Sequence, residues 1–165
     1  MKTGIFYGSA TGTTADVARR IGKALGVADA DIHDVADTAP DKVGDYDLLV
    51  IGSSTWGNGE LEDDWYDFLA GMQVLDLKGK KIAIFGCGDE SMSETFCNAV
   101  GILYDRLRDT GANFIGEYPA TEYSFEHSDA ADGATMRGLL LDEVNHPDLT
   151  DSRIEKWTAK VKEEL

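Results

Sequence analysis

The sequence predicts a three-layer α/β/α fold built around a doubly wound, five-stranded parallel sheet. Short apolar runs alternate along the chain with longer stretches of helical periodicity, and no segment repeats another. Strands that alternate with helices imply βαβ units, in which parallel strands are joined by right-handed crossovers. A length of 165 residues suits one domain, which we expect to span residues 1–165.

The five expected strands are short apolar runs. The clearest covers 47–52, where Leu48, Leu49, Val50 and Ile51 stand in a row, as is typical of a strand buried on both faces. The other four are expected at 2–7, 31–35, 81–86 and 113–118.

The four expected helices cover 14–25, 61–72, 95–110 and 153–165. In the first, the apolar positions 17, 18, 21, 24 and 25 share one helical face, and Gly26 is a suitable stop. Trp65 and Trp157 fall on the apolar faces of the second and fourth helices, so we expect both in the core.

Composition excludes several classes of protein. Thirty-one acidic residues against 15 Lys and Arg give a net charge of −16, which disfavours binding to nucleic acid. No apolar run approaches the ~18 residues of a membrane span, and the first residues do not resemble a signal peptide. Cys87 and Cys97 form neither a disulfide framework nor a metal motif, so we expect buried thiols and no metal. A cytoplasmic protein that docks on a basic partner is the expectation.

Ligands of doubly wound sheets bind beyond the carboxyl ends of the strands, at the switch point of the strand order. The loop at 8–14 carries four hydroxyls and two glycines where a helix is expected to begin, which is a place that favours anions. It lacks the lysine of a P-loop and the G-x-G-x-x-G fingerprint. Phosphate binding and a simple Ser/Thr-rich cap both remain open on this pattern.

The loops after the two central strands suggest a site for a flat ring. Trp56 stands in a glycine-rich loop at 52–60, where it either stacks on a ring or folds back onto the core. The loop at 86–94 follows the next strand and is placed to close the other side of such a pocket.

In their order and spacing, these motifs resemble those of the flavodoxins, the FMN-containing electron carriers, and specifically of the long-chain subgroup. The resemblance covers essentially the whole chain. It rests on the segments 9–14, 54–61, 86–89, 121–125, 138–143 and 148–154. Segment 121–125 resembles the opening of the long-chain insertion and 138–143 its close, and 148–154 resembles the start of the final helix.

The resemblance implies a set of residues that bind FMN non-covalently. The phosphate is expected at the first loop, and the isoalloxazine ring at the second and third. The implied cofactor-binding residues are Ser9, Ala10, Thr11, Gly12, Thr13, Thr14, Ser53, Ser54, Thr55, Trp56, Gly57, Asn58, Gly59, Cys87, Gly88, Asp89, Met92, Ser93 and Phe96.

Three positions receive particular roles from the resemblance. Trp56 is expected on the inner face of the ring. The backbone carbonyl of Gly57 is expected to turn toward the flavin N5–H on reduction, stabilising a neutral semiquinone. The third loop is one residue shorter than the common long-chain form and lacks the usual outer-face Tyr, so Met92 or Ser93 falls nearest that position.

An acidic run, Glu60, Glu62, Asp63 and Asp64, follows the second loop. Carboxylates close to the ring are expected to lower its second reduction potential and to form a docking face for basic partners. Acids are also favourable at the start of a helix, and both roles are compatible.

The function implied is that of a low-potential, one-electron carrier that cycles mainly between semiquinone and hydroquinone, with no catalytic residue. Expected partners are flavodoxin or ferredoxin reductases and low-potential oxidoreductases, and the expected state is a monomer. The alternative is a flavin-dependent quinone or NAD(P)H reductase, although no nicotinamide motif is present. A receiver domain is set aside, because the acidic residues that it needs after its first and third strands are absent at 8–10 and 52–54. A phosphate-binding module without redox chemistry is a further alternative.

Overall fold

The centre of the protein is a parallel β-sheet. A computed structural model describes residues 1–9, 11–56, 59–92 and 94–165. Its strands β1 (Thr3–Gly8), β2 (Ile32–Asp34), β3 (Leu48–Trp56), β5 (Lys81–Cys87) and β10 (Leu139–Leu141) lie in the order β10-β5-β3-β1-β2. Because β2 and β3 flank β1 on opposite sides, the winding direction reverses at β1, which creates a switch point between β1 and β3.

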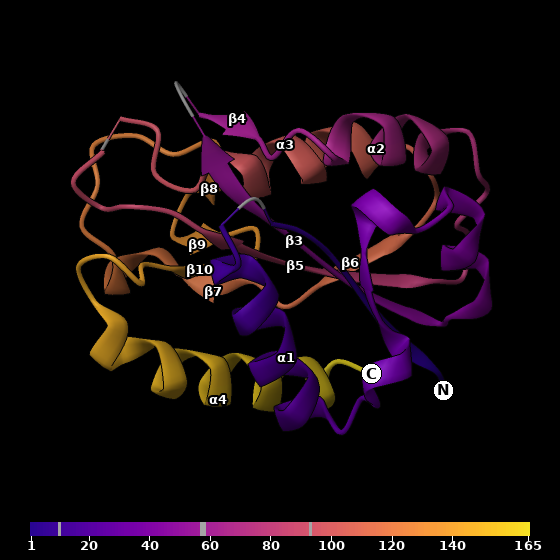
Figure 1. Cartoon of the computed structure of the whole chain (residues 1–165). Coiled ribbons are helices and arrows are strands. Elements are labelled where there is room, and N and C mark those ends of the chain that lie inside the picture. Colours follow the sequence, from indigo (N-terminus) through magenta and orange to yellow (C-terminus); the bar gives the residue numbers. More distant parts are fainter. Residues whose placement is uncertain (10, 57–58, 93) are drawn as a thin grey trace.

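Helices cover both faces of the sheet, which confirms the predicted three layers. Helices α1 (Thr13–Leu25) and α4 (Pro147–Glu163) lie together on one face. Helices α2 (Trp65–Gln73) and α3 (Asn98–Leu107) lie together on the other face (Figure 1). The layers bury the sheet completely at its centre, where Leu48, Leu49, Val50 and Ile51 of β3 are at most 1% exposed.

Two tryptophans join helices α2 and α4 to the sheet and to the segment that follows β6 through hydrogen bonds. Trp65 and Trp157 are fully buried, as predicted. Trp65 donates its indole N–H to the carbonyl of Gly52 on β3 (2.8 Å), and Trp157 donates to the carbonyl of Gly116 (2.7 Å). Each indole therefore satisfies its donor while burying a large apolar surface.

The predicted fifth strand at 113–118 is wrong in its extent. Strand β6 (Asn113–Ile115) pairs only with the first part of β5, and β10 pairs with the last part. The chain leaves the sheet at Gly116, whose φ of 79° belongs to the left-handed region that glycine tolerates. Strands β7 (Tyr118–Pro119), β8 (Ala131–Asp132) and β9 (Thr135–Met136) then form a separate antiparallel sheet before β10 returns.

The other differences from the predicted boundaries have local causes. The predicted second helix begins later, because Glu60–Leu61 form strand β4, which pairs antiparallel with the end of β3. The third helix begins at Asn98 rather than at residue 95. The last helix begins at Pro147 rather than at residue 153, because proline lacks the N–H that a first turn leaves unpaired. Across the described ranges, no helix is long and apolar enough to cross a membrane.

Tyr123 provides a test of how the 116–138 segment is attached to the sheet. Its buried hydroxyl donates to the carbonyl of Leu140 (2.7 Å) and accepts from the N–H of Leu140 (3.1 Å). We expect Tyr123→Phe to lower the free energy of unfolding by about 1–3 kcal/mol, because two buried backbone groups lose their partner. Urea denaturation measures the loss.

Tyr104→Phe is the matched control, because the Tyr104 hydroxyl makes no hydrogen bond within the described part of the chain. Equal stability of the two variants would show that the Tyr123 hydroxyl does not hold β10.

Candidate functional site

The register of the sheet brings three loops to one edge. Gly8 of β1 lies opposite Ser53 of β3, and Ser54 lies opposite Cys87 of β5. Leu141, at the end of β10, also lies opposite Cys87. The loops that follow β1, β3, β5 and β10 therefore leave the sheet side by side, as the sequence predicts for the first three.

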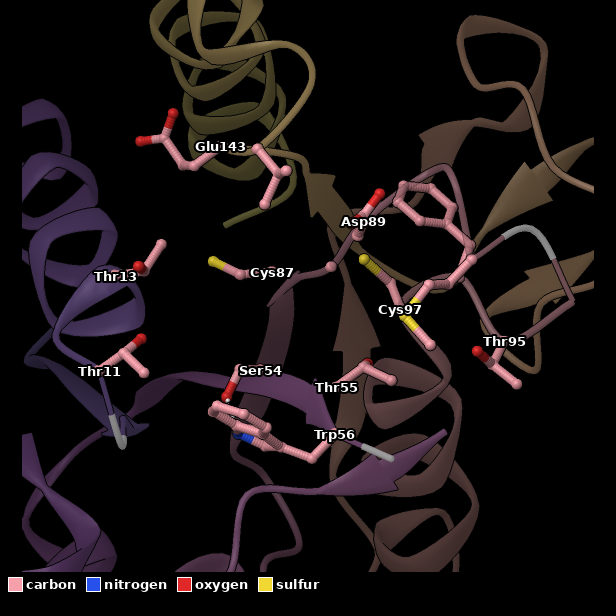
Figure 2. A pocket seen from close by; sticks show the side chains of 14 residues that line it. Thr11, Thr13, Ser54, Thr55, Trp56, Cys87, Asp89, Thr95, Cys97 and Glu143 are labelled. Carbon is pink, nitrogen blue, oxygen red and sulfur yellow. Dashed lines mark hydrogen bonds between the residues drawn. The ribbon is translucent and has the colours of Figure 1, made fainter. Parts of the chain in front are cut away.

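A pocket opens between these loops (Figure 2). Most of its lining residues were predicted from the sequence, and they come from the ends of β3 and β5 and from the loops after β1 and β5. Strand β3 continues to Trp56 rather than ending at residue 52, so Ser54, Thr55 and Trp56 lie on the strand and not in the predicted loop. The lining consists of Thr11, Thr13, Ser54, Thr55, Trp56, Cys87, Gly88, Asp89, Met92, Thr95, Phe96, Cys97, Glu143 and Val144.

The N-terminus of α1 forms one end of the pocket. Gly12 precedes the helix with a φ of 93°, a left-handed conformation that strains other residues, and its N–H donates to the Ser9 hydroxyl (3.1 Å). The first N–H groups of a helix have no intrahelical acceptor. The Thr14 hydroxyl is buried and has no hydrogen-bond partner in the described structure. A hydroxyl and free N–H groups at a helix N-terminus suit an anion such as a phosphate.

Trp56 lies at the mouth of the pocket and is 41% exposed. The alternative that it folds back onto the core is therefore wrong. Its indole N–H donates to the Ser54 hydroxyl (2.8 Å), which helps to orient the ring (Figure 2). Thr55, between them, accepts from the N–H of Ala99 (3.1 Å) and so ties the end of β3 to α3. An exposed, oriented indole beside an anion site suits a flat ligand that carries a phosphate.

The loop after β5 forms the opposite wall. Met92 lines the pocket and is 53% exposed, while Phe96 is buried against Tyr123 and Phe125. Hydrogen bonds from the Ser91 hydroxyl and N–H lower the pKa of Asp89. A flexible, polarizable thioether thus occupies the wall at the place where the sequence lacks an aromatic residue.

Five predicted residues are not among those that line the pocket, and their contact with a cofactor stays a prediction: Ser9, Gly12, Thr14, Ser53 and Gly59. Ser53 is fully buried: its hydroxyl donates to the carbonyl of Ser54 (2.8 Å) and accepts from the N–H of Glu62 (3.1 Å). Ala10, Gly57, Asn58 and Ser93 lie outside the described residues, so their roles stay predictions.

Four lining residues were missed: Thr95, Cys97, Glu143 and Val144. Glu143 and Val144 follow β10, a strand that was not among those predicted. The signal was the run of three leucines at 139–141, bounded by Gly138 and Asp142. Glu143 is paired with Arg20 (Oε1 to Nη1, 2.5 Å), so the pocket has a carboxylate whose charge is balanced from α1.

The two cysteines are buried, as predicted, although both line the pocket. Burial raises the pKa of Cys87 to about 12 and that of Cys97 well above its usual value. Thiols held neutral in this way are poor nucleophiles. Neither thiol is therefore suited to act as a nucleophile.

Glu62 departs from the expected acidic face. Its side chain is buried, and its Oε2 packs against the end of β1, where a Cβ on Gly8 would lie only 2.5 Å away. Burial, with a smaller contribution from the charge of Asp64, raises the pKa of Glu62 to about 7. Glu60, Asp63 and Asp64 remain exposed. The surface acids near the pocket are thus three of the four predicted.

These observations define a doubly wound α/β protein with a ligand pocket at its switch point. The chain belongs to the flavodoxin family, whose family model, described as "Flavodoxin", matches residues 5–157. It is 43% identical to Flavodoxin 1 of Escherichia coli strain K12 over 165 residues, covering 99% of this chain and 94% of that protein. It is also 43% identical to a flavodoxin of Klebsiella pneumoniae, covering 98% of this chain and 93% of that protein.

Solved structures of flavodoxins share the fold. A Fusobacterium nucleatum flavodoxin bound to flavin mononucleotide superimposes with a TM-score of 0.91 at 29% identity, covering 100% of this chain and 99% of that one. Oxidised Flavodoxin 2 from Bacillus cereus superimposes with a TM-score of 0.77 at 26% identity, covering 100% of both chains. The predicted flavodoxin-like fold is confirmed.

The raised pKa of Glu62 predicts a pH-dependent stability. A carboxyl with a folded pKa of about 7 and an ordinary value of 4.5 destabilises the fold as pH rises through this window, because the unfolded chain ionises first. We expect Glu62→Gln apoprotein to match the unmodified chain at pH 4.5 and to exceed its free energy of unfolding at pH 8. Urea denaturation at both pH values tests this.

Glu60→Gln removes the same charge from an exposed neighbour and serves as the control. A gain at pH 8 that is equal in both variants would assign the effect to net charge rather than to burial of Glu62.

Proposed function

We propose that the pocket binds FMN non-covalently and that the chain, as a flavodoxin, carries single electrons at low potential. The observation that carries the proposal is that one pocket joins the N-terminus of α1, with the hydroxyls of Thr11 and Thr13, to the exposed indole of Trp56. The solved flavodoxin with flavin mononucleotide bound supports it. A flavin-dependent quinone or NAD(P)H reductase is not favoured, because the relatives described above are flavodoxins.

The phosphate end of the site is proposed at the start of α1. Here Ser9, Ala10, Thr11, Gly12, Thr13 and Thr14 would surround the phosphate with hydroxyl and N–H donors. Among the described lining residues none is Lys or Arg, so neutral donors and the helix dipole must balance the charge of a phosphate. Arg20 does not compensate for their absence, because its guanidinium pairs with Glu143 and Asp151.

The ring end is proposed between the loops after β3 and β5. Trp56 would stack on the inner face of the ring, while Met92 and Phe96 would contribute the opposite wall. Backbone contacts with the ring are proposed for Gly57, Asn58, Gly59, Cys87, Gly88 and Asp89. Ser54, Thr55 and Ser93 are proposed to lie beside these contacts. The buried Ser53 supports the end of β3 through its hydrogen bonds.

FMN supplies the redox chemistry, since no residue of this pocket needs to act as acid, base or nucleophile. The chain's own contribution is binding, orientation and electrostatics. Trp56 and Phe96, which line the pocket, would shield the ring from water. The proposed role of Gly57 is to offer a backbone carbonyl to a protonated ring nitrogen. The low potential is supported by the acids beside the site, because negative charge opposes reduction to an anion.

Membership of the long-chain subgroup is also proposed. Its support is the segment between β6 and β10, residues 116–138, which interrupts the fifth position of the sheet and carries the small sheet β7-β9-β8. We further propose a monomer that forms a single domain over residues 1–165 and acts in the cytoplasm. Basic redox proteins, such as flavodoxin or ferredoxin reductases, are the proposed partners, because the chain carries a net charge of −16.

Removal of the Trp56 indole tests the ring site. We expect Trp56→Ala to raise the dissociation constant for FMN about tenfold, through lost stacking and burial, and to restore the fluorescence of bound flavin. Fluorescence titration of the apoprotein measures both quantities. Tyr66→Ala is the control, since Tyr66 is 42% exposed but is absent from the pocket lining. Unchanged affinity and fluorescence in Trp56→Ala would contradict the stacking role.

Salt dependence tests the docking face formed by Glu60, Asp63 and Asp64. We expect the rate of electron exchange with a basic ferredoxin-type reductase to fall several-fold as ionic strength rises from about 0.01 to 0.15 M. Neutralising the three acids (Glu60→Gln, Asp63→Asn, Asp64→Asn) should flatten this dependence in stopped-flow measurements.

The matched control neutralises three exposed acids at the opposite edge of the sheet. Asp76 and Asp109 precede β5 and β6, and Glu163 ends α4 near the start of β5. If Asp76→Asn, Asp109→Asn, Glu163→Gln flattens the salt dependence equally, the effect reports net charge and the docking face is wrong.

A further inference from the structure

Asp142 is a fully buried carboxylate immediately after β10, and it holds two loops together. Its Oδ1 accepts from the N–H groups of Val144 (2.9 Å) and Asn145 (2.8 Å). Its Oδ2 accepts from the N–H of Glu90 (2.9 Å) and from the side-chain amide of Asn145 (2.8 Å). Four donors therefore occupy the acceptor positions of one carboxylate. One of the four, the Glu90 N–H, belongs to the loop after β5, which carries one wall of the pocket.

Further contacts join the same two segments. Asn145 also donates from its side-chain amide to Asp89 (2.6 Å), and the N–H of Gly88 donates to the carbonyl of Leu141 (2.9 Å). The Glu90 carboxylate reaches His146 (Oε2 to Nε2, 3.1 Å). These contacts and the four bonds of Asp142 form a set that we call the loop clamp, which consists of Leu141, Asp142, Asn145 and His146 holding residues 88–90.

The opposite sides of both segments face the pocket. Gly88 and Asp89 line it from the loop after β5, and Glu143 and Val144 line it from the turn after β10. Asp142 itself is absent from the lining. Asp142 therefore fixes the position of two pocket walls through hydrogen bonds on the side away from the pocket, and it does not itself line the pocket.

A metal ion is the alternative reason for such a cluster, since ligand atoms of Glu90, Asp142 and His146 lie within 4.8 Å of one another. Two observations oppose it. The oxygens of Asp142 are already engaged by four donors. The guanidinium of Arg153 lies 3.9 Å from the other oxygen of Glu90, where its positive charge would repel a cation. The cluster instead joins the turn after β10 to the loop after β5.

We propose that Asp142 is a positioning residue for the flavin ring. By fixing the N–H of Glu90, it holds Gly88 and Asp89 at the spacing that the ring requires, and so it affects ring affinity and reduction potentials without touching the cofactor. The proposal rests on the proposed FMN site. It concerns the ring end alone, because the loop clamp does not contact the 9–14 loop in the described structure.

The test compares Asp142→Asn with Asp148→Asn. The first replaces one acceptor oxygen by an NH₂ group that faces an N–H donor, with little change in volume. The second removes the same charge six residues away, from an exposed side chain of α4. In Asp142→Asn apoprotein we expect the amide of Glu90 to exchange its hydrogen about tenfold faster, as measured by NMR. The control should exchange as the unmodified chain does.

Binding separates a positioning role from general loosening. We expect Asp142→Asn to weaken FMN and riboflavin by the same factor, about tenfold, because the clamp supports the ring and not the phosphate. Both one-electron reduction potentials of bound FMN should shift relative to those of Asp148→Asn. If Asp142→Asn does not fold, Asn145→Ala removes the amide that joins Asp142 to Asp89 and is expected to change the same quantities in the same direction.

Three results would overturn the proposal. Unchanged exchange at Glu90 would show that Asp142 does not hold the loop. Faster exchange with unchanged flavin affinity and potentials would show that the held loop does not position the ring. A larger loss for FMN than for riboflavin would show that the whole site has loosened. Failure of the unmodified chain to take up FMN is a separate outcome, which overturns the proposed function and this proposal together.

Discussion

The in-register parallel pairing of β1, β3 and β5 is the constraint on which the site depends. Because Gly8 lies opposite Ser53 and Ser54 lies opposite Cys87, the loops that follow β1, β3 and β5 leave the sheet at the same edge. A shift of one residue would move every side chain of a strand to the opposite face of the sheet, against the other pair of helices. The buried apolar residues of β3 oppose such a shift, so the core packing that stabilises the sheet also assembles the pocket.

The pocket accommodates an anionic ligand in an acidic protein by offering neutral donors at one end and by pairing one of its carboxylates. Hydroxyls and backbone N–H groups form the end at α1, and the carboxylate of Glu143 is paired with Arg20. Glu62, close behind β1, has a pKa of about 7 and thus carries a proton for much of the time at neutral pH. Asp89, whose pKa is lowered, is the lining carboxylate for which the described residues provide hydrogen-bond donors but no ion pair.

Sequence reasoning was most successful where pattern and local geometry coincide. Apolar runs marked β1, β3 and β5, and the glycine- and hydroxyl-rich loops after them marked most of the pocket lining. It failed where tertiary pairing decided the outcome. Leu139–Leu141 is too short to be distinguished from a loop without knowing that β6 leaves part of β5 unpaired. The burial of Glu62 could not be predicted from its acidic surroundings, because Glu60, Asp63 and Asp64 in the same run are exposed.

The hydrogen bonds of Tyr123 have a consequence for contacts between molecules. Strand β10 lies at the end of the strand order. An edge strand has unpaired N–H and C=O groups with which a strand of another molecule can pair. Both of these groups at Leu140 are already bound by one phenolic hydroxyl. A side chain thus takes the place that another polypeptide would occupy, and the sheet is protected at this edge from growing by strand addition into aggregates.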